Sequence, residues 1–134
     1  IIPCFNESRT ILTILELIKK SKVDIKEIIV VDDFSTDLTR NLLNEINDNL
    51  VKVIYHDKNY GKGAALRTGL KHAIGDICII QDADLEYDPS DYDNIINEIH
   101  KNQKKVVYGS RVLNKNRYYH KSFISNFRIL QITH

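Results

Sequence analysis

The sequence has 134 residues, of which 43% are hydrophobic and 28% are charged, and its formal net charge is +1. A chain of this length can bury a substantial core, so we expect residues 1–134 to form a single domain. The near balance of charges argues against a nucleic acid or an acidic macromolecule as the main ligand.

The chain alternates short apolar runs with segments of helical periodicity. Strands are expected at 1–4, 28–31, 51–55, 77–80 and 106–108, where β-branched and other apolar residues cluster. A first helix is expected after Ser8, with an apolar stripe of Ile11, Leu12, Leu15 and Ile18. A second is expected after an N-cap at Ser35-Thr36-Asp37 and runs through Leu42, Leu43 and Ile46. Two more are expected around 64–73 and 92–100. This order predicts an α/β fold with three layers, in which helices cover both faces of a mostly parallel sheet.

Two further features bear on the state of the chain. Cys4 and Cys78 lie far apart in apolar runs, so we expect buried, reduced thiols, as in a cytoplasmic protein. No signal peptide is recognisable, and no apolar run approaches the length of a membrane span. Because the chain begins at Ile1 without Met and stops in an apparent helix at 128–134, we expect a fragment truncated at both ends.

Two carboxylates follow the strand at 77–80. Asp82 and Asp84 stand one residue apart, and in open α/β sheets ligands bind at the carboxyl ends of the strands. Carboxylates there can share a hard divalent cation with a substrate phosphate. We therefore expect a metal–diphosphate site, the plainer alternative being a strand end that caps a turn.

The other expected strands also end in polar or flexible residues. Asp33 or Glu7 could accept N–H groups of a nucleotide base, with Phe5 lining one side of the ring. The run Gly61-Lys62-Gly63 permits close approach of the backbone to a diphosphate beside a mobile positive charge, unless it is an ordinary turn that opens a helix. Arg111 suits a second, acceptor phosphate, the alternative being a surface salt bridge. If the sheet is parallel, all these groups meet along one edge.

These motifs, in this order, resemble the family 2 glycosyltransferases, and most closely the dolichyl- or polyprenyl-phosphate hexose synthases. The resemblance rests on Ile2-Pro3-Cys4-Phe5-Asn6-Glu7, the run 31–37, the run 59–70, the run 82–89 and Gly109-Ser110-Arg111. It implies a GT-A fold and an inverting transfer of a hexose from a GDP- or UDP-linked sugar. One departure is Phe34, which stands where glycine is common in the family.

The resemblance also assigns roles to individual residues. It implies a nucleotide-sugar site formed by Pro3, Phe5, Glu7, Asp33, Ser35, Lys62, Gly63, Asp82 and Ala83. It implies that Mg²⁺ or Mn²⁺ is held by Asp82 and Asp84, with Glu86 facing the metal. Arg111 would bind the acceptor lipid phosphate, and Asp84 and Arg111 are the expected catalytic residues. The five histidines show no metal-ligand spacing, and solvated or capping roles are expected for them.

The acceptor is less well defined than the donor. A phosphate acceptor needs no general base, whereas a sugar hydroxyl needs a catalytic carboxylate, and no acidic residue follows Arg111 in this chain. This favours a polyprenyl phosphate at the cytoplasmic face of a membrane, with the basic, aromatic segment 114–121 on that surface or packed on the domain. Hydroxyl transfer in surface polysaccharide synthesis and a non-catalytic sugar-nucleotide domain remain alternatives. A nucleotidyltransferase is disfavoured because no Gly-rich loop follows the first strand.

Overall fold

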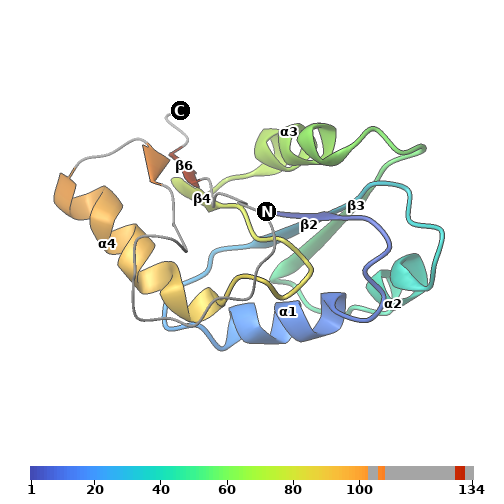
Figure 1. Ribbon diagram of the computed structural model, residues 1–134, viewed down its shortest axis with the longest axis horizontal. Helices are drawn as coiled ribbons and strands as arrows, with labels where there is room; N and C mark the ends of the chain where they lie inside the picture. The colour runs from blue at the N-terminus through green and yellow to red at the C-terminus, as the bar shows by residue number, and fades with distance from the viewer. Residues whose placement is uncertain (103–105, 108–128, 132–134) are drawn as a thin grey trace.

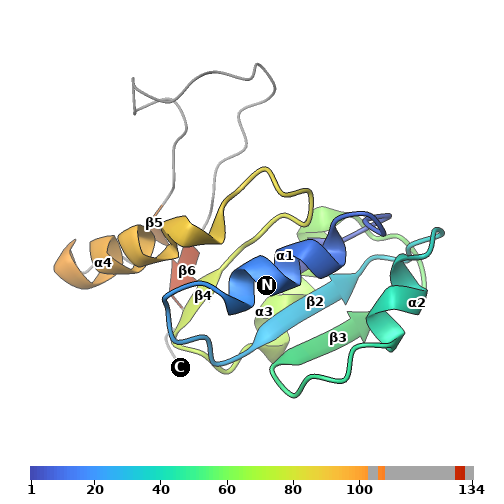
Figure 2. The ribbon, with the colours of Figure 1, turned by 90° about the horizontal axis from the view of Figure 1, so that it is seen from below.

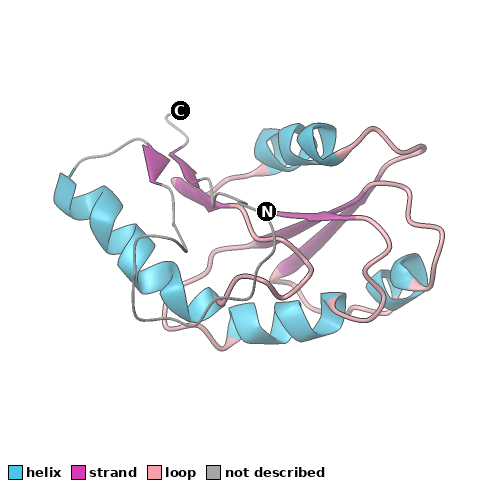
Figure 3. Cartoon of the chain, in the orientation of Figure 1, coloured by secondary structure: helices cyan, strands magenta, loops and turns pink. Residues whose placement is uncertain are grey.

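The computed structural model describes residues 1–102, 106–107 and 129–131 (Figure 1). Its elements in chain order are β1 (Ile2–Cys4), α1 (Ile11–Lys19), β2 (Ile28–Asp32), α2 (Thr39–Asn44), β3 (Val51–Tyr55), α3 (Lys62–His72), β4 (Ile77–Ile79), the 3-10 helix η1 (Pro89–Asp91), α4 (Tyr92–Asn102), β5 (Val106–Val107) and β6 (Ile129–Gln131). The alternation of strands and helices in Figure 3 confirms the predicted α/β class.

The strands form two hydrogen-bonded groups that meet at β1. The first group has the order β1-β2-β3 and is parallel, and in Figure 2 the arrows of β2 and β3 point to the same edge. In the second group β4 and β5 flank β6 and are both antiparallel to it, so they run parallel to each other. The Ile1 amino group donates to the Ile79 carbonyl at 2.7 Å, and the Gln81 N–H donates to the Ile1 carbonyl at 3.0 Å. These bonds place β4 beside β1.

The sheet is covered on both faces, as predicted. Figure 1 shows α3 on one face and α1 and α2 on the other. Every residue of β2 is buried: Ile28 and Val30 belong to the core under α1, whereas Ile29 and Val31 pack with Ala65 of α3. Side chains alternate across a strand, so a strand that is covered twice needs an unbroken apolar run.

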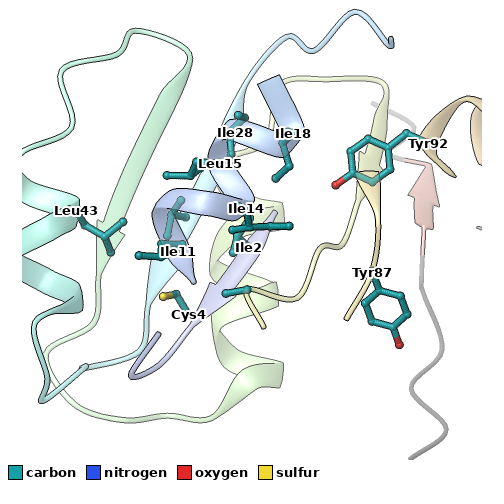
Figure 4. Close-up of a cluster of buried hydrophobic side chains, with 12 residues drawn as sticks. Ile2, Cys4, Ile11, Ile14, Leu15, Ile18, Ile28, Leu43, Tyr87 and Tyr92 are labelled. Carbon is teal, nitrogen blue, oxygen red and sulfur yellow. The ribbon is translucent and has the colours of Figure 1, made fainter. Parts of the chain in front are cut away.

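The larger core cluster contains the apolar stripe of α1 (Figure 4). The buried residues of the helix are Ile11, Ile14, Leu15 and Ile18. This spacing of three, four and seven residues is that of one helix face. The expected stripe was wrong at one position, because Leu12 is 43% exposed and Ile14 takes its place in the core.

The helix starts also differ from those predicted. The N-cap of α1 is Thr10 and not Ser8, whose N–H instead donates to Asp37 Oδ2 at 3.2 Å. The N-cap of α2 is Leu38 without a side-chain cap, although Asp37 Oδ1 accepts the Thr39 N–H at 2.9 Å. The side chains of Ser35 and Asp37 accept N–H groups from the loop after β1, and this use competes with capping of α2. Helix α2 also ends at Asn44, so Ile46 packs on the core from outside the helix.

The described part of the tail contains a strand where a helix was expected. Residues 129–131 form β6, which lies between β4 and β5. Strand β4 ends at Ile79, one residue before the expected end at Ile80. Strand β5 agrees with the expected strand at 106–108 over 106–107, and Tyr108 lies outside the described residues. Within the described ranges, no helix is long and apolar enough to cross a membrane. Cys4 and Cys78 are both buried and unpaired, as expected.

Candidate functional site

A cavity of about 190 Å³ opens at the edge of the sheet where β1, β2 and β4 end. Its lining comes from the end of β1, from the loops after these strands and from the start of α3: Pro3, Cys4, Phe5, Glu7, Asp33, Lys62, Ala65, Asp82, Ala83 and Asp84. Pockets for small ligands typically measure roughly 300–1,000 Å³, so a larger ligand would extend from this cavity into solvent. The cavity brings together the carboxylates that follow β2 and β4, as the parallel order predicts.

Asp33 is the most firmly held carboxylate of the cavity. Its Oδ1 accepts the Tyr60 N–H at 2.9 Å and pairs with His56 Nδ1 at 2.7 Å, and its Oδ2 accepts the Gly61 N–H at 2.6 Å. Burial raises the pKa of Asp33, but the three hydrogen bonds outweigh burial and hold the pKa below its ordinary value. Asp33 is therefore an ionised acceptor whose position is fixed before a ligand binds.

The turn that supplies two of these donors depends on Gly61. This residue has φ +86° and ψ 159°, a conformation that is essentially restricted to glycine. Its N–H points at Asp33, and its carbonyl accepts from Ala64 and Ala65 at the start of α3. Gly61 thus joins the carboxylate to the helix that borders the cavity.

His56 was missed by the sequence analysis, which expected solvated or capping histidines. Its side chain is only 10% exposed and lies between β3 and α3, where Nε2 contacts the Thr68 hydroxyl at 2.9 Å. A histidine at a strand end gives no periodic signal, and its two partners, Asp33 and Thr68, are 23 and 12 residues away in the sequence. Only the folded chain brings the three side chains together.

The neighbouring carboxylate, Asp32, has a structural role. It is completely buried, and its Oδ2 accepts from Arg40 Nε at 2.7 Å. The Arg40 guanidinium also donates to the His56 carbonyl and lies about 5 Å from the ring centres of Phe34 and Tyr55. Arg40 therefore connects the ends of β2 and β3 beneath the site.

Strained backbone gathers in the loops that form the cavity edge. Within the described ranges the non-glycine residues with positive φ are Asn6, Phe34 and Leu85, which follow β1, β2 and β4. The φ of +66° at Phe34 explains why glycine suits this position, and the contact with Arg40 holds the phenylalanine there. Asn6 Oδ1 accepts the Thr36 and Asp37 N–H groups, which ties the first two loops together.

The carboxylates after β4 are held more loosely. Lys62 Nζ lies 2.6 Å from Asp82 Oδ1 and 2.8 Å from Oδ2, so an ammonium group faces both oxygens of this carboxylate. The Lys62 side chain is 57% exposed and that of Asp82 is 16% exposed. Asp84 is exposed, and its Oδ1 accepts the Glu86 N–H at 3.0 Å.

A buried hydrogen-bond network supports this loop from below. Gln81 is 1% exposed; its Nε2 donates to the Asp82 and Tyr87 carbonyls, and its Oε1 accepts from the Tyr92 hydroxyl at 2.7 Å. Burial raises the pKa of Tyr92, so its hydroxyl stays a donor at neutral pH. The backbone of the loop is thus fixed, whereas its carboxylates reach the cavity.

The donor set fits a divalent cation that is shared with a ligand. No group of three or more His, Cys, Asp or Glu side chains is arranged to hold a metal within the part of the chain that the structure describes. Mg²⁺ is commonly bound by one or two carboxylates together with substrate phosphates and water. Asp82 and Asp84 line one cavity, and a lysine ammonium already faces Asp82, so this position favours positive charge.

The structure places most of the predicted binding residues at the cavity. Those that line it are Pro3, Phe5, Glu7, Asp33, Lys62, Asp82, Ala83 and Asp84. Ser35, Gly63 and Glu86 are not part of the lining. Ser35 is buried and its hydroxyl accepts the Asn6 N–H at 2.9 Å, while Glu86 is exposed. Arg111 and the segment 114–121 lie outside the described residues. The lining also includes Cys4 and Ala65, which were not predicted.

In open α/β sheets, ligands bind outside the carboxyl ends of the strands, and the carboxylate-lined cavity of this chain lies there. The model of the family "Glycosyl transferase family 2" matches residues 1–133, and the chain belongs to this family. A curated relative from Methanococcus voltae, UDP-N-acetylglucosamine–dolichyl-phosphate N-acetylglucosaminyltransferase, is 33% identical over 131 residues. The match covers 85% of this chain and 51% of the relative, so the chain spans about half the length of that protein.

Two solved structures are similar to the fold, which is of the GT-A type. The S. aureus TarS fragment 1–349 in complex with UDP superposes with a TM-score of 0.76 at 22% identity, over 98% of this chain and 45% of that one. The Pyrobaculum calidifontis mannosyltransferase PcManGT, in complex with GDP-Man and Mn²⁺, is 30% identical. It has a TM-score of 0.63, over 73% of this chain and 30% of that one.

Proposed function

We propose that this chain forms the donor-binding part of an enzyme that transfers a hexose from a nucleotide-diphosphate sugar to a polyprenyl or dolichyl phosphate. The observation that carries the proposal is a cavity that is lined both by the fixed carboxylate of Asp33 and by the carboxylates of Asp82 and Asp84. A nucleotide diphosphate needs these two kinds of site at once. The base needs an immobile acceptor for its N–H groups, and the diphosphate needs positive charge.

The base would bind beside Asp33. The carboxylate is ionised and held by three donors, and Phe5, which is 45% exposed, offers an apolar surface on the same cavity. Both uracil and guanine carry ring N–H groups that can donate to a carboxylate, so Asp33 is compatible with UDP- and GDP-linked donors. Glu7 also lines the cavity, and its carboxylate accepts from the Thr10 hydroxyl at 2.6 Å, which fixes it as a second acceptor.

The diphosphate would bind between Lys62 and the loop after β4. Asp82 and Asp84 would hold Mg²⁺ or Mn²⁺, which when bound neutralises the charge that develops on the departing nucleotide diphosphate. Lys62 is exposed and flexible, so its ammonium can leave Asp82 and bind a phosphate oxygen as the ligand arrives. Two similar proteins support a nucleotide-sugar donor with a divalent metal. The name of the M. voltae relative includes UDP-N-acetylglucosamine, and the P. calidifontis mannosyltransferase was solved in complex with GDP-Man and Mn²⁺.

The acceptor would be an anionic lipid phosphate. A phosphate oxygen is already deprotonated, so it can attack the anomeric carbon without a general base, and a direct displacement inverts that centre. Arg111 would offset the repulsion between the two anions by a bidentate contact to the acceptor phosphate. The basic segment 114–121 would rest on the cytoplasmic face of the membrane that carries the lipid.

A transfer assay tests this proposal on the full-length protein. UDP- and GDP-linked hexoses would be incubated with polyprenyl phosphate and Mn²⁺, and the product would be extracted into organic solvent and identified by mass spectrometry. We expect a lipid-linked hexose that requires the metal. Transfer only to free oligosaccharides would favour an acceptor hydroxyl, and metal-dependent nucleotide binding without any transfer would favour a non-catalytic domain.

A further inference from the structure

The His56 side chain has no role in the proposed chemistry, yet both of its ring nitrogens have partners within the protein. It lies between two partners, with Nδ1 at 2.7 Å from Asp33 Oδ1 and Nε2 at 2.9 Å from the Thr68 hydroxyl. Since Asp33 is ionised, Nδ1 carries a proton and donates to Oδ1, while Nε2 contacts the Thr68 hydroxyl. The three side chains thus form one chain of hydrogen bonds from α3 to the cavity.

This chain of hydrogen bonds determines which acceptor sites of Asp33 remain free. A carboxylate offers about four lone-pair sites, and the donors from His56, Tyr60 and Gly61 occupy three of them. The His56 bond and the Tyr60 bond both go to Oδ1, so the remaining capacity is on Oδ2. Asp33 lines the cavity, so a ligand placed there can supply the missing donor.

The position of His56 is itself fixed by packing as well as by hydrogen bonds. The edge of its ring meets the Tyr60 ring at a centroid distance of 5.3 Å and an interplanar angle of 90°. Its carbonyl accepts from the Arg40 guanidinium at 2.7 Å, and its N–H donates to the Asp32 carbonyl at 2.9 Å. The ring has partners at both nitrogens and a packed aromatic neighbour, so it can hold Asp33 in place, as supporting side chains do in a binding site.

We infer that His56 is a positioning residue for base recognition, which together with Thr68 fixes the Asp33 carboxylate so that one Oδ2 lone pair faces an N–H group of the nucleotide base. This inference rests on the proposed function. His56 does not contact the ligand in this inference. Its effect on ligand binding must therefore pass through Asp33, and it must concern the base and not the diphosphate.

Two substitutions at position 56 separate the hydrogen bond from the space that the ring fills. His56→Phe keeps a flat ring and removes both nitrogen atoms. His56→Asn keeps an N–H donor close to the position of Nδ1 and loses the contact with Thr68. Calorimetry would measure the binding of UDP, of GDP and of inorganic pyrophosphate, each with Mn²⁺, to the full-length protein and to each variant.

We expect His56→Phe to weaken the preferred nucleotide about tenfold, as for the loss of a hydrogen bond to a charged group, and to leave pyrophosphate within about twofold. His56→Asn should restore most of the lost affinity. In an Asp33→Asn background, His56→Phe should have no further effect on nucleotide binding, because the group through which it acts is already changed.

Each result has a defined meaning. If the unaltered protein binds neither nucleotide, the proposed function fails, and the inference fails with it. If it binds a nucleotide that His56→Phe binds equally well, or if the variant loses pyrophosphate to the same extent, only the inference is overturned. Should His56→Phe not fold, Thr68→Val would replace it, with an expected loss of about threefold for the nucleotide alone. No loss in Thr68→Val would overturn the inference.

Discussion

The two acidic parts of the cavity are held in opposite ways. Asp33, after β2, is 3% exposed and receives three N–H donors from the protein. Asp82 and Asp84, after β4, reach toward solvent, and the charge of Asp82 is balanced by a lysine that is 57% exposed. The fixed carboxylate suits a flat base, because recognition of a base depends on the direction of its N–H hydrogen bonds. The looser pair suits a cation and a diphosphate, which arrive together and bring their own charges.

The backbone is held by hydrogen bonds in both parts, so the contrast concerns the side chains. Gly61 anchors one loop to Asp33 and α3, and buried Gln81 anchors the other to Tyr87 and Tyr92. The difference therefore lies in whether the protein supplies the partners of each carboxylate or leaves them to the ligand. Four substitutions test this division, in order of the expected effect.

The largest effect is expected at the looser pair. Asp84→Ala should lower the affinity for UDP or GDP in the presence of Mn²⁺ by about a hundredfold, since it removes a charged ligand that the protein does not replace. Without metal, the residual affinity should equal that of the unaltered protein. Calorimetry with Mn²⁺ and with chelator measures both values. Asp91→Ala, in η1 and away from the cavity, is the control, and an equal loss there would refute the assignment.

Asp33→Asn should weaken nucleotide binding roughly thirtyfold and leave Mn²⁺–pyrophosphate binding unchanged, because only the base part of the site is altered. It should also lower the free energy of unfolding by about 1–3 kcal/mol, since an amide NH₂ then faces partly buried N–H donors. Chemical denaturation measures this loss. An unchanged stability would show that the three hydrogen bonds do not hold the carboxylate.

The pH dependence of that loss follows from the lowered pKa of Asp33, where the hydrogen bonds outweigh burial. A carboxyl group whose pKa is lower in the folded than in the unfolded protein stabilises the fold above its unfolded pKa and loses this effect as the pH falls through its folded pKa. The difference in unfolding free energy between the unaltered protein and Asp33→Asn should be constant above about pH 5 and shrink below it. A difference that grows toward acid pH would contradict the account.

Gly61→Ala tests the backbone of the loop that donates to Asp33. The substitution should cost about 1–3 kcal/mol of stability, because φ +86° with ψ 159° is strained for any residue with a Cβ atom. Gly63→Ala, two residues on, is the matched control. Gly63 has no positive φ, and its Cβ would meet only Arg67 at 3.7 Å, so alanine should be neutral or stabilising in the helix. Equal stabilities of the two variants would contradict the role of Gly61.

The smallest effect is expected for Lys62→Gln. An exposed ion pair contributes little, so removing the ammonium from Asp82 should tighten Mn²⁺ binding in the absence of nucleotide by only about threefold. The affinity for Mn²⁺–pyrophosphate should fall instead, since Lys62 then no longer reaches the phosphates. Lys71→Gln, exposed near the end of α3, should change neither value. Weaker binding of Mn²⁺ alone would mean that Lys62 does not compete with the cation.

The sequence was sufficient for the class of fold and for most of the cavity lining. Strand ends are predictable because a doubly covered strand such as β2 needs an unbroken apolar run, and polar residues must follow it. Three features could not be predicted in this way. The helix caps were misplaced because Ser8 and Ser35 bond across loops, Leu12 was given the place of Ile14, and β6 has the composition of an apolar helix segment. Each depends on contacts between residues distant in sequence.

The same reason explains why His56 was missed and why the structural role of Asp32 was not predicted. This role differs from that of Asp33 only through Arg40, His56 and Gly61, which lie on other elements. The resemblance to a family assigned roles to the motifs. A pattern of residue types, however, does not reveal which carboxylate already has its hydrogen-bond donors within the protein.

Binding of UDP and GDP with Mn²⁺, and again with chelator, shows whether the two acidic parts of the cavity act together. We expect that one nucleotide binds more tightly than the other, that the metal increases its affinity, and that inorganic pyrophosphate competes with it. Selectivity between the bases without dependence on the metal, or dependence on the metal without selectivity, would show that only one part of the cavity is used. Absence of binding by the folded protein, with or without Mn²⁺, would contradict the account.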